Sequence, residues 1–241
     1  GKLDDSDALL DASVHSDRHP TELHAALGEP DISPTMASAL FVAALREAFE
    51  ESGVLFCEGI TTDLTANAAQ RLRQGASFNQ VLADLGLRLH LGAIAPWSRW
   101  ITPRMPSVTN KRFDTRFFVA VLPAGQQPVH DNIEAIDSVW LSPMDALTRY
   151  WAGGLPLAPP QIMTLVSLLP YADTASVLQA AKRQAPPLIL PEPFDDDDGV
   201  RTLCYPGDVR HSVSERAIPG PTRLRFVAGR FEPTRGFEEF L

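Results

Sequence analysis

The clearest pattern of hydrophobic and polar positions lies between residues 35 and 52. Apolar residues recur there with the period of an α-helix and share one face: Leu40, Phe41, Ala44, Leu45, Ala48 and Phe49. Glu47, Glu50 and Glu51 fall at i, i+3 and i+4 and occupy the other face. Gly53 suits the left-handed position that often follows a helix end. We therefore predict a long helix over 35–52 whose second half carries three carboxylates.

These three carboxylates predict a bound cation. Negative side chains at this spacing repel one another, and the C-terminal end of a helix already disfavours negative charge. A cation would relieve both effects. Oxygen ligands suit a hard ion, so we expect Mg²⁺, with Mn²⁺ as the alternative. The simpler interpretation from the spacing alone is a solvated acidic helix end.

The rest of the chain predicts a mixture of helices and strands. Helices are expected over 21–27, 63–73, 77–85, 143–151 and 159–184, the last interrupted at Pro170. Strands are expected over 87–95, 112–122, 133–141, 188–190, 200–204 and 224–227. The continuous apolar run 117–122 favours a buried central strand. The acidic run 195–198, followed by Gly199, is expected to be a solvated hairpin tip.

Composition and charge exclude several classes of function. The chain has 241 residues and a formal net charge of −9, which argues against binding to a nucleic-acid backbone. No apolar run approaches the roughly 18 residues of a membrane span, and no signal peptide is apparent. We therefore expect a cytoplasmic protein without a membrane partner, with the matrix of an organelle as the alternative location. Cys57 and Cys204 are too few and too far apart for a disulfide framework or a zinc site, and we expect buried free thiols.

Several histidines and acids fall within residues 8–36. They are His15, Asp17, His19, Glu22 and His24. Their spacing allows a metal site, whereas the simpler interpretation is a solvent-exposed loop.

The string Arg46-Glu47-x-x-Glu50-Glu51-x-Gly53-Val54 resembles the second half of the Nudix hydrolase signature, G-x5-E-x7-R-E-U-x-E-E-x-G-U, where U is aliphatic. The first half is found at the start of the chain, where Gly1 and Asp7 form G-x5-D. Between Asp7 and Arg46 lie 38 residues where the signature has seven, so about 31 are inserted. A box divided in this way is similar to that of the peroxisomal acyl-coenzyme A diphosphatase branch of the family.

Two further parts of the chain resemble that branch. One is Trp97-Ser98-Arg99-Trp100-Ile101-Thr102-Pro103, which leads to Lys111-Arg112-Phe113-Asp114-Thr115. The other is Trp140-Leu141-Ser142-Pro143, followed by Leu157-Ala158-Pro159-Pro160-Gln161. The resemblance therefore runs from residue 1 to about residue 210.

The resemblance implies a fold and a division into domains. We expect a Nudix-type α/β/α sandwich with a mixed central sheet over residues 1–151, with residues 8–36 as an insertion inside the box. Residues 152–241 are expected to form a C-terminal extension of helices and strands packed on the same domain. In Nudix folds strands precede the signature glycine, so we expect this chain to be a fragment that lacks them.

The resemblance also implies a metal site and a catalytic group. Glu47, Glu50 and Glu51 would hold Mg²⁺, and the backbone carbonyl of Gly1 would add a ligand. Arg46 is expected to pair with Glu47 or a neighbouring carboxylate and to orient it.

A general base is often supplied in this family by an acid on a later loop. Glu134 is our candidate, with Asp131 second.

The expected substrate contacts are the basic and aromatic residues around the first stretch. They are Trp97, Arg99, Arg104, Lys111, Arg112 and Arg116, which surround the loop that carries Trp97 and Trp100. An indole could stack on adenine, and Arg112 and Arg116 would share one face of the predicted strand. The alternative is that both tryptophans are packing residues and that the arginines are solvated.

Together these features predict an enzyme that hydrolyses a diphosphate linkage with the help of Mg²⁺. The expected substrate is coenzyme A or acyl-coenzyme A, giving 3′,5′-ADP and (acyl-)4′-phosphopantetheine. The alternatives are another substrate such as ADP-ribose or a dinucleotide, or a non-catalytic nucleotide-binding module of the same fold. The only partner expected is the small nucleotide substrate, and the chain is expected to be a monomer or a homodimer.

Overall fold

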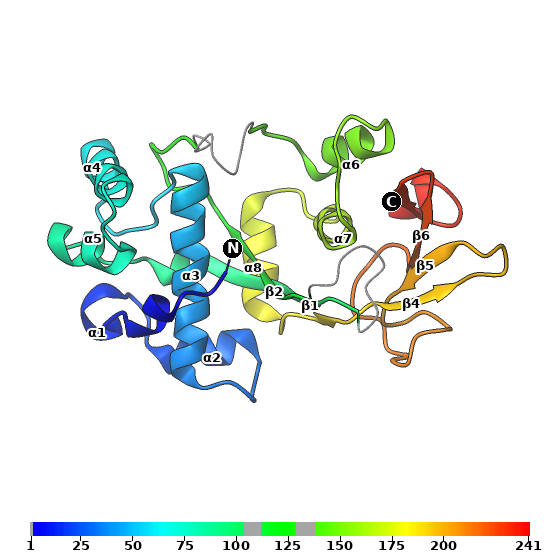
Figure 1. The fold of residues 1–241 in the computed structure, drawn as a ribbon, viewed down its shortest axis with the longest axis horizontal. Coiled ribbons are helices and arrows are strands. Elements are labelled where there is room, and N and C mark those ends of the chain that lie inside the picture. Colours follow the sequence, from blue (N-terminus) through cyan, green and yellow to red (C-terminus); the bar gives the residue numbers. More distant parts are fainter. Residues whose placement is uncertain (1, 104–111, 129–137) are drawn as a thin grey trace. The chain divides into compact units, whose positions relative to one another are not determined.

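The computed structural model describes residues 2–103, 112–128 and 138–241 (Figure 1). The chain forms two compact units that interleave along the sequence. The first unit contains Gly1–Pro96, Phe118–Val139 and Leu178–Ala185, and the second contains Trp97–Phe117, Trp140–Val177 and Pro186–Leu241. The division into domains at residue 151 stays a prediction, and each unit is described by itself.

The first unit is mainly helical in its described residues. Its 3₁₀ helices are η1 (Asp5–Leu9) and η2 (Leu91–Ala93), and its α-helices are α1 (Ala12–His15), α2 (Pro20–Leu27), α3 (Pro34–Ser52), α4 (Thr62–Arg73), α5 (Phe78–Leu85) and the greater part of α8 (Thr174–Arg183). The helices predicted over 35–52, 21–27, 63–73 and 77–85 are confirmed. His15 lies in α1 and His24 in α2, whereas residues 16–19 between these helices are not helical, so the predicted loop is present only in part.

Helix α3 is defined at both ends by local signals. The Ser33 side chain accepts a hydrogen bond from the Met36 amide at 3.1 Å, and Pro34 occupies the first turn, where its missing N–H costs nothing. Gly53 ends the helix at φ 70°, in the left-handed region that glycine adopts without strain. The apolar face of α3 packs against α2 (Figure 1). Phe41 and Phe49 are both buried, so this face carries much of the core of the unit.

Among the described residues, three strands form a sheet in the order β2-β1-β3. They are β1 (Ile94–Ile101), β2 (Asp114–Ala120) and β3 (Leu188–Ile189), and β1 runs parallel to β3. The prediction of a strand over 87–95 is wrong. Leu89 forms only isolated bridges, and the chain turns through η2 before β1 begins. The next predicted strand is present, but among the described residues it is an end strand with partly buried side chains, not a buried central one.

The second unit combines helices with an antiparallel sheet. The helices are α6 (Pro143–Trp151), α7 (Pro159–Leu168) and η3 (Phe237–Phe240), and the strands β4 (Glu192–Asp195), β5 (Arg201–Cys204), β6 (Arg223–Val227) and β7 (Arg230–Glu232) lie in that order. The predicted helix over 143–151 and the pair of helices within 159–184 are confirmed. Sequence patterns missed β4 and β7. These strands are short and depend on pairing with β5 and β6.

The core of this unit gathers aromatic side chains. The indole of Trp100 contacts Tyr205 edge to face at 5.7 Å between ring centroids. The Tyr150 hydroxyl donates to the Phe231 carbonyl at 2.7 Å and accepts from the Phe231 amide at 2.9 Å, which fixes β7 to α6. The acidic run 195–198 lies at the β4–β5 hairpin, as predicted, but it is not fully solvated, because the Asp196 side chain is 17% exposed and pairs with Arg225 at 2.6 Å.

Two further predictions concern the strand over 133–141 and the absence of a membrane span. Most of the predicted strand 133–141 falls within residues 129–137, which lie outside the described residues, and residues 138–141 are not in a strand. Within the described residues, every helix is too short or too polar to cross a membrane.

Candidate functional site

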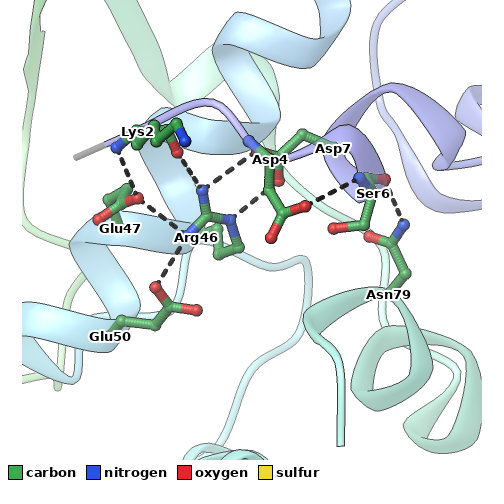
Figure 2. Close-up of polar contacts among 8 residues, drawn as sticks. All are labelled: Lys2, Asp4, Ser6, Asp7, Arg46, Glu47, Glu50 and Asn79. Carbon is green, nitrogen blue, oxygen red and sulfur yellow. Dashed lines mark hydrogen bonds and ion pairs between the residues drawn. The ribbon is translucent and has the colours of Figure 1, made fainter.

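Arg46 joins the two separated parts of the acidic motif, which are Asp7 and the α3 segment with Glu47, Glu50 and Glu51 (Figure 2). Its Nη1 lies 2.9 Å from Glu47 Oε1 and 2.8 Å from Glu50 Oε2 on the same helix. Its Nε and Nη2 donate to the two carboxylate oxygens of Asp7, at 2.9 and 3.1 Å. The predicted pairing of Arg46 with Glu47 is present. A single guanidinium therefore fixes acids from both ends of the inserted segment.

Asp7 is held in place by its own 3₁₀ helix. Asp4 caps η1, and the Asp4 amide donates to Asp7 Oδ2 at 2.8 Å. The Asp7 side chain is only 1% exposed, and that of Arg46 is 9% exposed. Bidentate pairing of this kind is strong because both partners are charged and their geometry is matched.

Three hydrogen bonds made by Lys2 and Asn79 complete the arrangement. The Lys2 carbonyl accepts from Arg46 Nη2 at 2.8 Å, and the Lys2 amide donates to Glu47 Oε1 at 3.1 Å. On α5, Asn79 Nδ2 donates to the Ser6 carbonyl at 2.7 Å (Figure 2). Sequence reasoning missed Asn79, because 73 residues separate it from Ser6 and no local pattern marks it.

Burial and neighbouring charges shift the pKa values of Arg46 and Glu50. Burial acts to lower the pKa of Arg46, but the hydrogen bond and charge of Asp7 outweigh it, so this pKa is raised above the usual range. Burial raises the pKa of Glu50, and the negative charges of Glu47 and Asp7 add to the rise, while Arg46 opposes it. Glu50 therefore carries its negative charge at a cost that a further cation would reduce.

The carboxylates that lie near the end of α3 retain oxygens for a metal ion. Within the described residues, four carboxylate oxygens have no protein partner: Glu47 Oε2, Glu50 Oε1 and both oxygens of Glu51. This donor set suits a hard divalent cation. In the described parts of the chain, no three His, Cys, Asp or Glu side chains already converge on a metal position. The free carboxylate oxygens therefore fit a divalent ion by their chemistry. Since they do not yet converge, binding of the ion would require these side chains to rotate toward it.

The predicted substrate residues that the structure describes belong to the second unit. Arg99 Nε and Nη2 pair with both oxygens of Asp114, at 2.8 and 2.7 Å, and Arg116 lies 3.1 Å from Asp114 Oδ1. These pairs hold the pKa of Asp114 below its usual value, with the Arg99 hydrogen bond as the largest cause. The structure thus brings Arg99 and Arg116 together around one acid.

Arg112 does not share a strand face with Arg116, contrary to expectation. Strand β2 begins only at Asp114. Before it, the Thr102 hydroxyl accepts from the Phe113 amide at 2.9 Å, and Arg112 Nε donates to the Thr102 carbonyl at 3.3 Å. The Phe113 amide therefore donates to a side-chain hydroxyl.

Both tryptophans pack within the second unit. Trp97 Nε1 donates to Ser167 Oγ at 2.8 Å, and its ring contacts Tyr171. Trp100 is 4% exposed, and its Nε1 donates to Ser98 Oγ at 3.1 Å. The packing alternative therefore describes these indoles. Gly1, Arg104, Lys111, Asp131 and Glu134 lie outside the described residues, so the roles predicted for them stay predictions.

Comparison with solved structures defines the class of protein. The chain is similar to a NUDIX hydrolase from Alicyclobacillus acidocaldarius, with a TM-score of 0.57 and 27% sequence identity over 77% of this chain and 79% of the other. The fold is thus the predicted α/β fold of Nudix type.

A family comparison narrows this class. The model for the NUDT19 Nudix domain matches residues 15–168, which is well over half of the 241 residues. The chain therefore belongs to the NUDT19 Nudix domain family.

Individual relatives agree with this assignment. The chain is 30% identical over 149 residues to the acyl-coenzyme A diphosphatase NUDT19 of Xenopus laevis, covering 54% of this chain and 39% of that protein. It is 29% identical over 155 residues to the human protein of the same name, covering 58% of this chain and 41% of that protein. The chain thus spans about two fifths of the length of these relatives.

Proposed function

We propose that this protein hydrolyses the diphosphate linkage of coenzyme A or of an acyl-coenzyme A, with Mg²⁺ or Mn²⁺ as cofactor. The products would be 3′,5′-ADP and 4′-phosphopantetheine or its acylated form. The observation that carries the proposal is the contact of Arg46 with Asp7, Glu47 and Glu50, because it joins the divided motif into one site. The names of the relatives support the substrate.

The metal would be held by Glu47, Glu50 and Glu51, with the carbonyl of Gly1 as an additional ligand. When bound, such an ion neutralises charge on phosphoryl oxygens and lowers the pKa of a bound water. Arg46 restrains one oxygen of Glu47 and one of Glu50, so each carboxylate keeps its second oxygen for a ligand. Arg46 thus acts by orienting its neighbours, and buried Asp7 keeps Arg46 in place.

Substrate binding would use the basic residues of the second unit. Arg99, Arg104, Lys111, Arg112 and Arg116 are the proposed contacts, and charge-assisted hydrogen bonds from arginine suit phosphate oxygens. Asp114 pre-orients two of these guanidinium groups, Arg99 and Arg116. Glu134 is proposed as the general base that accepts a proton from the attacking water.

The test is hydrolysis of coenzyme A with Mg²⁺ and, separately, with EDTA, the products being separated by chromatography. We expect metal-dependent release of 3′,5′-ADP. Because Glu51 is proposed as a direct ligand, Glu51→Gln should lower kcat at least about 100-fold, the upper end of the loss seen for groups that only support ligands. Glu58→Gln is the matched control, since Glu58 is an exposed acid paired with Arg88 and should keep parental activity.

Each other outcome has a distinct meaning. Cleavage of ADP-ribose or a dinucleotide, but not of coenzyme A, would keep the chemistry and replace the substrate. Parental turnover by Glu51→Gln would contradict the metal-site assignment. Absence of hydrolysis with every diphosphate, together with retained nucleotide binding, would favour a non-catalytic module.

A further inference from the structure

An apolar pocket of about 280 Å³ lies within the second unit. Its walls come from β1, from the residues around the start of β2, from the N-terminus of α7 and from the antiparallel sheet. The three segments 100–103, 113–117 and 158–160 all contribute to it. All three belong to or adjoin the stretches that resemble the acyl-coenzyme A diphosphatase branch. The volume is near the lower end of the range for small-molecule sites.

We propose that this pocket binds the aliphatic acyl chain of a coenzyme A thioester. The chemical class of the pocket is set by its lining, in which Trp100, Phe117, Leu203 and Phe231 supply apolar surface. That the bound alkyl chain belongs to an acyl group rests on the proposed function. That the pocket suits a linear apolar ligand rests only on its lining.

The two faces of β2 separate apolar from ionic chemistry. Thr115 and Phe117 line the pocket. Asp114 and Arg116 stand at the alternating positions and form ion pairs instead. Since successive strand residues point to opposite faces, the guanidinium of Arg116 is directed away from the pocket. A phosphate would therefore not be neutralised inside the pocket by this residue.

The helix end at the pocket is also unsuited to an anion. A helix N-terminus usually offers free N–H groups to phosphate. In α7 the first two residues are Pro159 and Pro160, which have no N–H, and the Ala158 amide already donates to Gln161 Oε1 at 2.8 Å. This end of α7 thus presents carbon atoms to the pocket.

A nucleobase fits the lining less well than an alkyl chain. The Thr102 hydroxyl already accepts from the Phe113 amide, which leaves few polar groups for the edge of adenine. Burial of polar ring atoms without hydrogen bonds is unfavourable. An alkyl chain needs no such partners, so the apolar lining favours it.

One exposed residue of the pocket lining is followed back along the chain by a basic residue. Phe113 lines the pocket and is 57% exposed. Its neighbour Arg112 is exposed and donates to the Thr102 carbonyl, and within the described residues no carboxylate pairs with Arg112. A ligand with an apolar chain and an anionic remainder would match this combination.

The proposal is tested by titration calorimetry in EDTA, so that binding is measured without turnover. The ligands are coenzyme A and its butyryl, hexanoyl, octanoyl and decanoyl thioesters. We expect affinity to rise about fourfold for each added methylene until the pocket is full, since burial of one methylene contributes about 0.8 kcal/mol. An affinity that does not depend on chain length would overturn the proposal.

A pocket-filling variant locates the chain. Ala158→Phe should abolish the chain-length dependence while leaving the affinity for unacylated coenzyme A within about twofold. Ala175→Phe, at an exposed alanine in the first turn of α8, is the matched control and should keep the parental profile. Should Ala158→Phe not fold by circular dichroism, Thr115→Phe fills the same pocket from β2. A parental profile in a folded pocket-filling variant would contradict the proposal.

Two further outcomes separate this inference from the proposed function. If 3′,5′-ADP, which has no chain, loses as much affinity in Ala158→Phe as the decanoyl thioester, the pocket holds the base and the proposal fails. If coenzyme A is not hydrolysed with Mg²⁺ but the chain-length dependence is present in EDTA, the proposed function fails and the pocket assignment stands.

Discussion

Arg46 and Asp7 form a bidentate ion pair across 39 positions of the sequence, with Nε to Oδ1 at 2.9 Å and Nη2 to Oδ2 at 3.1 Å. The pair brings the segment before the insertion against the helix that follows it. Because both side chains are almost fully buried, neither can exchange its partner for water without cost. This relationship underlies the first two predictions.

Asp7→Asn should destabilise the fold by about 1.5–3 kcal/mol, the value typical of hydrogen bonds to a charged group. The loss stays below that for an isolated buried charge, because Arg46 keeps Glu47 and Glu50 as partners. Urea unfolding measures the change. Asp5→Asn is the matched control, since Asp5 is an exposed acid in the same 3₁₀ helix and should shift stability by less than about 0.5 kcal/mol. Equal effects of the two substitutions would refute a special role for Asp7.

Asn79→Ala should cost about 1 kcal/mol of stability, because the Ser6 carbonyl loses the amide donor that holds it. Since the Ser6–Asp7 segment positions Arg46, the variant should also bind Mn²⁺ more weakly, which can be measured by calorimetry. Asn67→Ala on α4 is the control. Asn67 accepts a hydrogen bond from Arg71 on the exposed face of its helix, and its loss should leave Mn²⁺ affinity unchanged. Identical Mn²⁺ affinities for Asn79→Ala and the parent would limit Asn79 to a packing role.

Asp208 gives the second unit an acid-sensitive ion pair. Burial acts to raise the pKa of Asp208, but hydrogen bonds from Arg223, the Arg210 amide and Thr222 outweigh it and hold this pKa below its ordinary value of 3.8. The folded state therefore binds the proton less readily than the unfolded chain. The stabilisation is fully present above about pH 3.8 and is lost as pH falls through the lower pKa of the folded state.

Asp208→Asn should accordingly reduce stability by about 1.5–3 kcal/mol at pH 7, and the difference from the parent should shrink below pH 3.8. Urea midpoints between pH 2 and pH 7 measure it. Asp197→Asn serves as control, because the Asp197 side chain is 96% exposed and its pair with Arg210 contributes little. A difference that stayed constant over the whole pH range would show that titration of Asp208 does not contribute.

The two cysteines should be unreactive in the folded protein. Burial raises the pKa of Cys57 to about 12 and that of Cys204 to about 11, and nearby carboxylates add to both. The thiolate is the reactive form, so at pH 8 very little of it is present. We expect no reaction with a thiol reagent in buffer and two reacting thiols in guanidinium chloride. A thiol that reacts before unfolding would reveal local opening around that residue.

Local signals in the sequence determined the helices of this protein. The apolar period of α3, the Ser33 cap and Gly53 act over a few residues, and so do the Ser77 cap and the glycine that ends α5. The three glutamates of the acidic motif were also evident from their spacing, whereas Asp7 was found only through the resemblance to the Nudix signature. The helices and the spacing of the glutamates were predictable because their energies depend on neighbours within one or two helical turns.

Tertiary structure alone decided the features that join distant parts of the chain. The start of β1 at Ile94, the end position of β2 in the sheet and the short strands β4 and β7 depend on pairing partners far away in sequence. The contact of Asn79 with Ser6 and the lining of the apolar pocket have the same origin. Spacing along the chain does not encode which side chains meet across long loops, because packing of the whole core selects among many pairings of similar local energy.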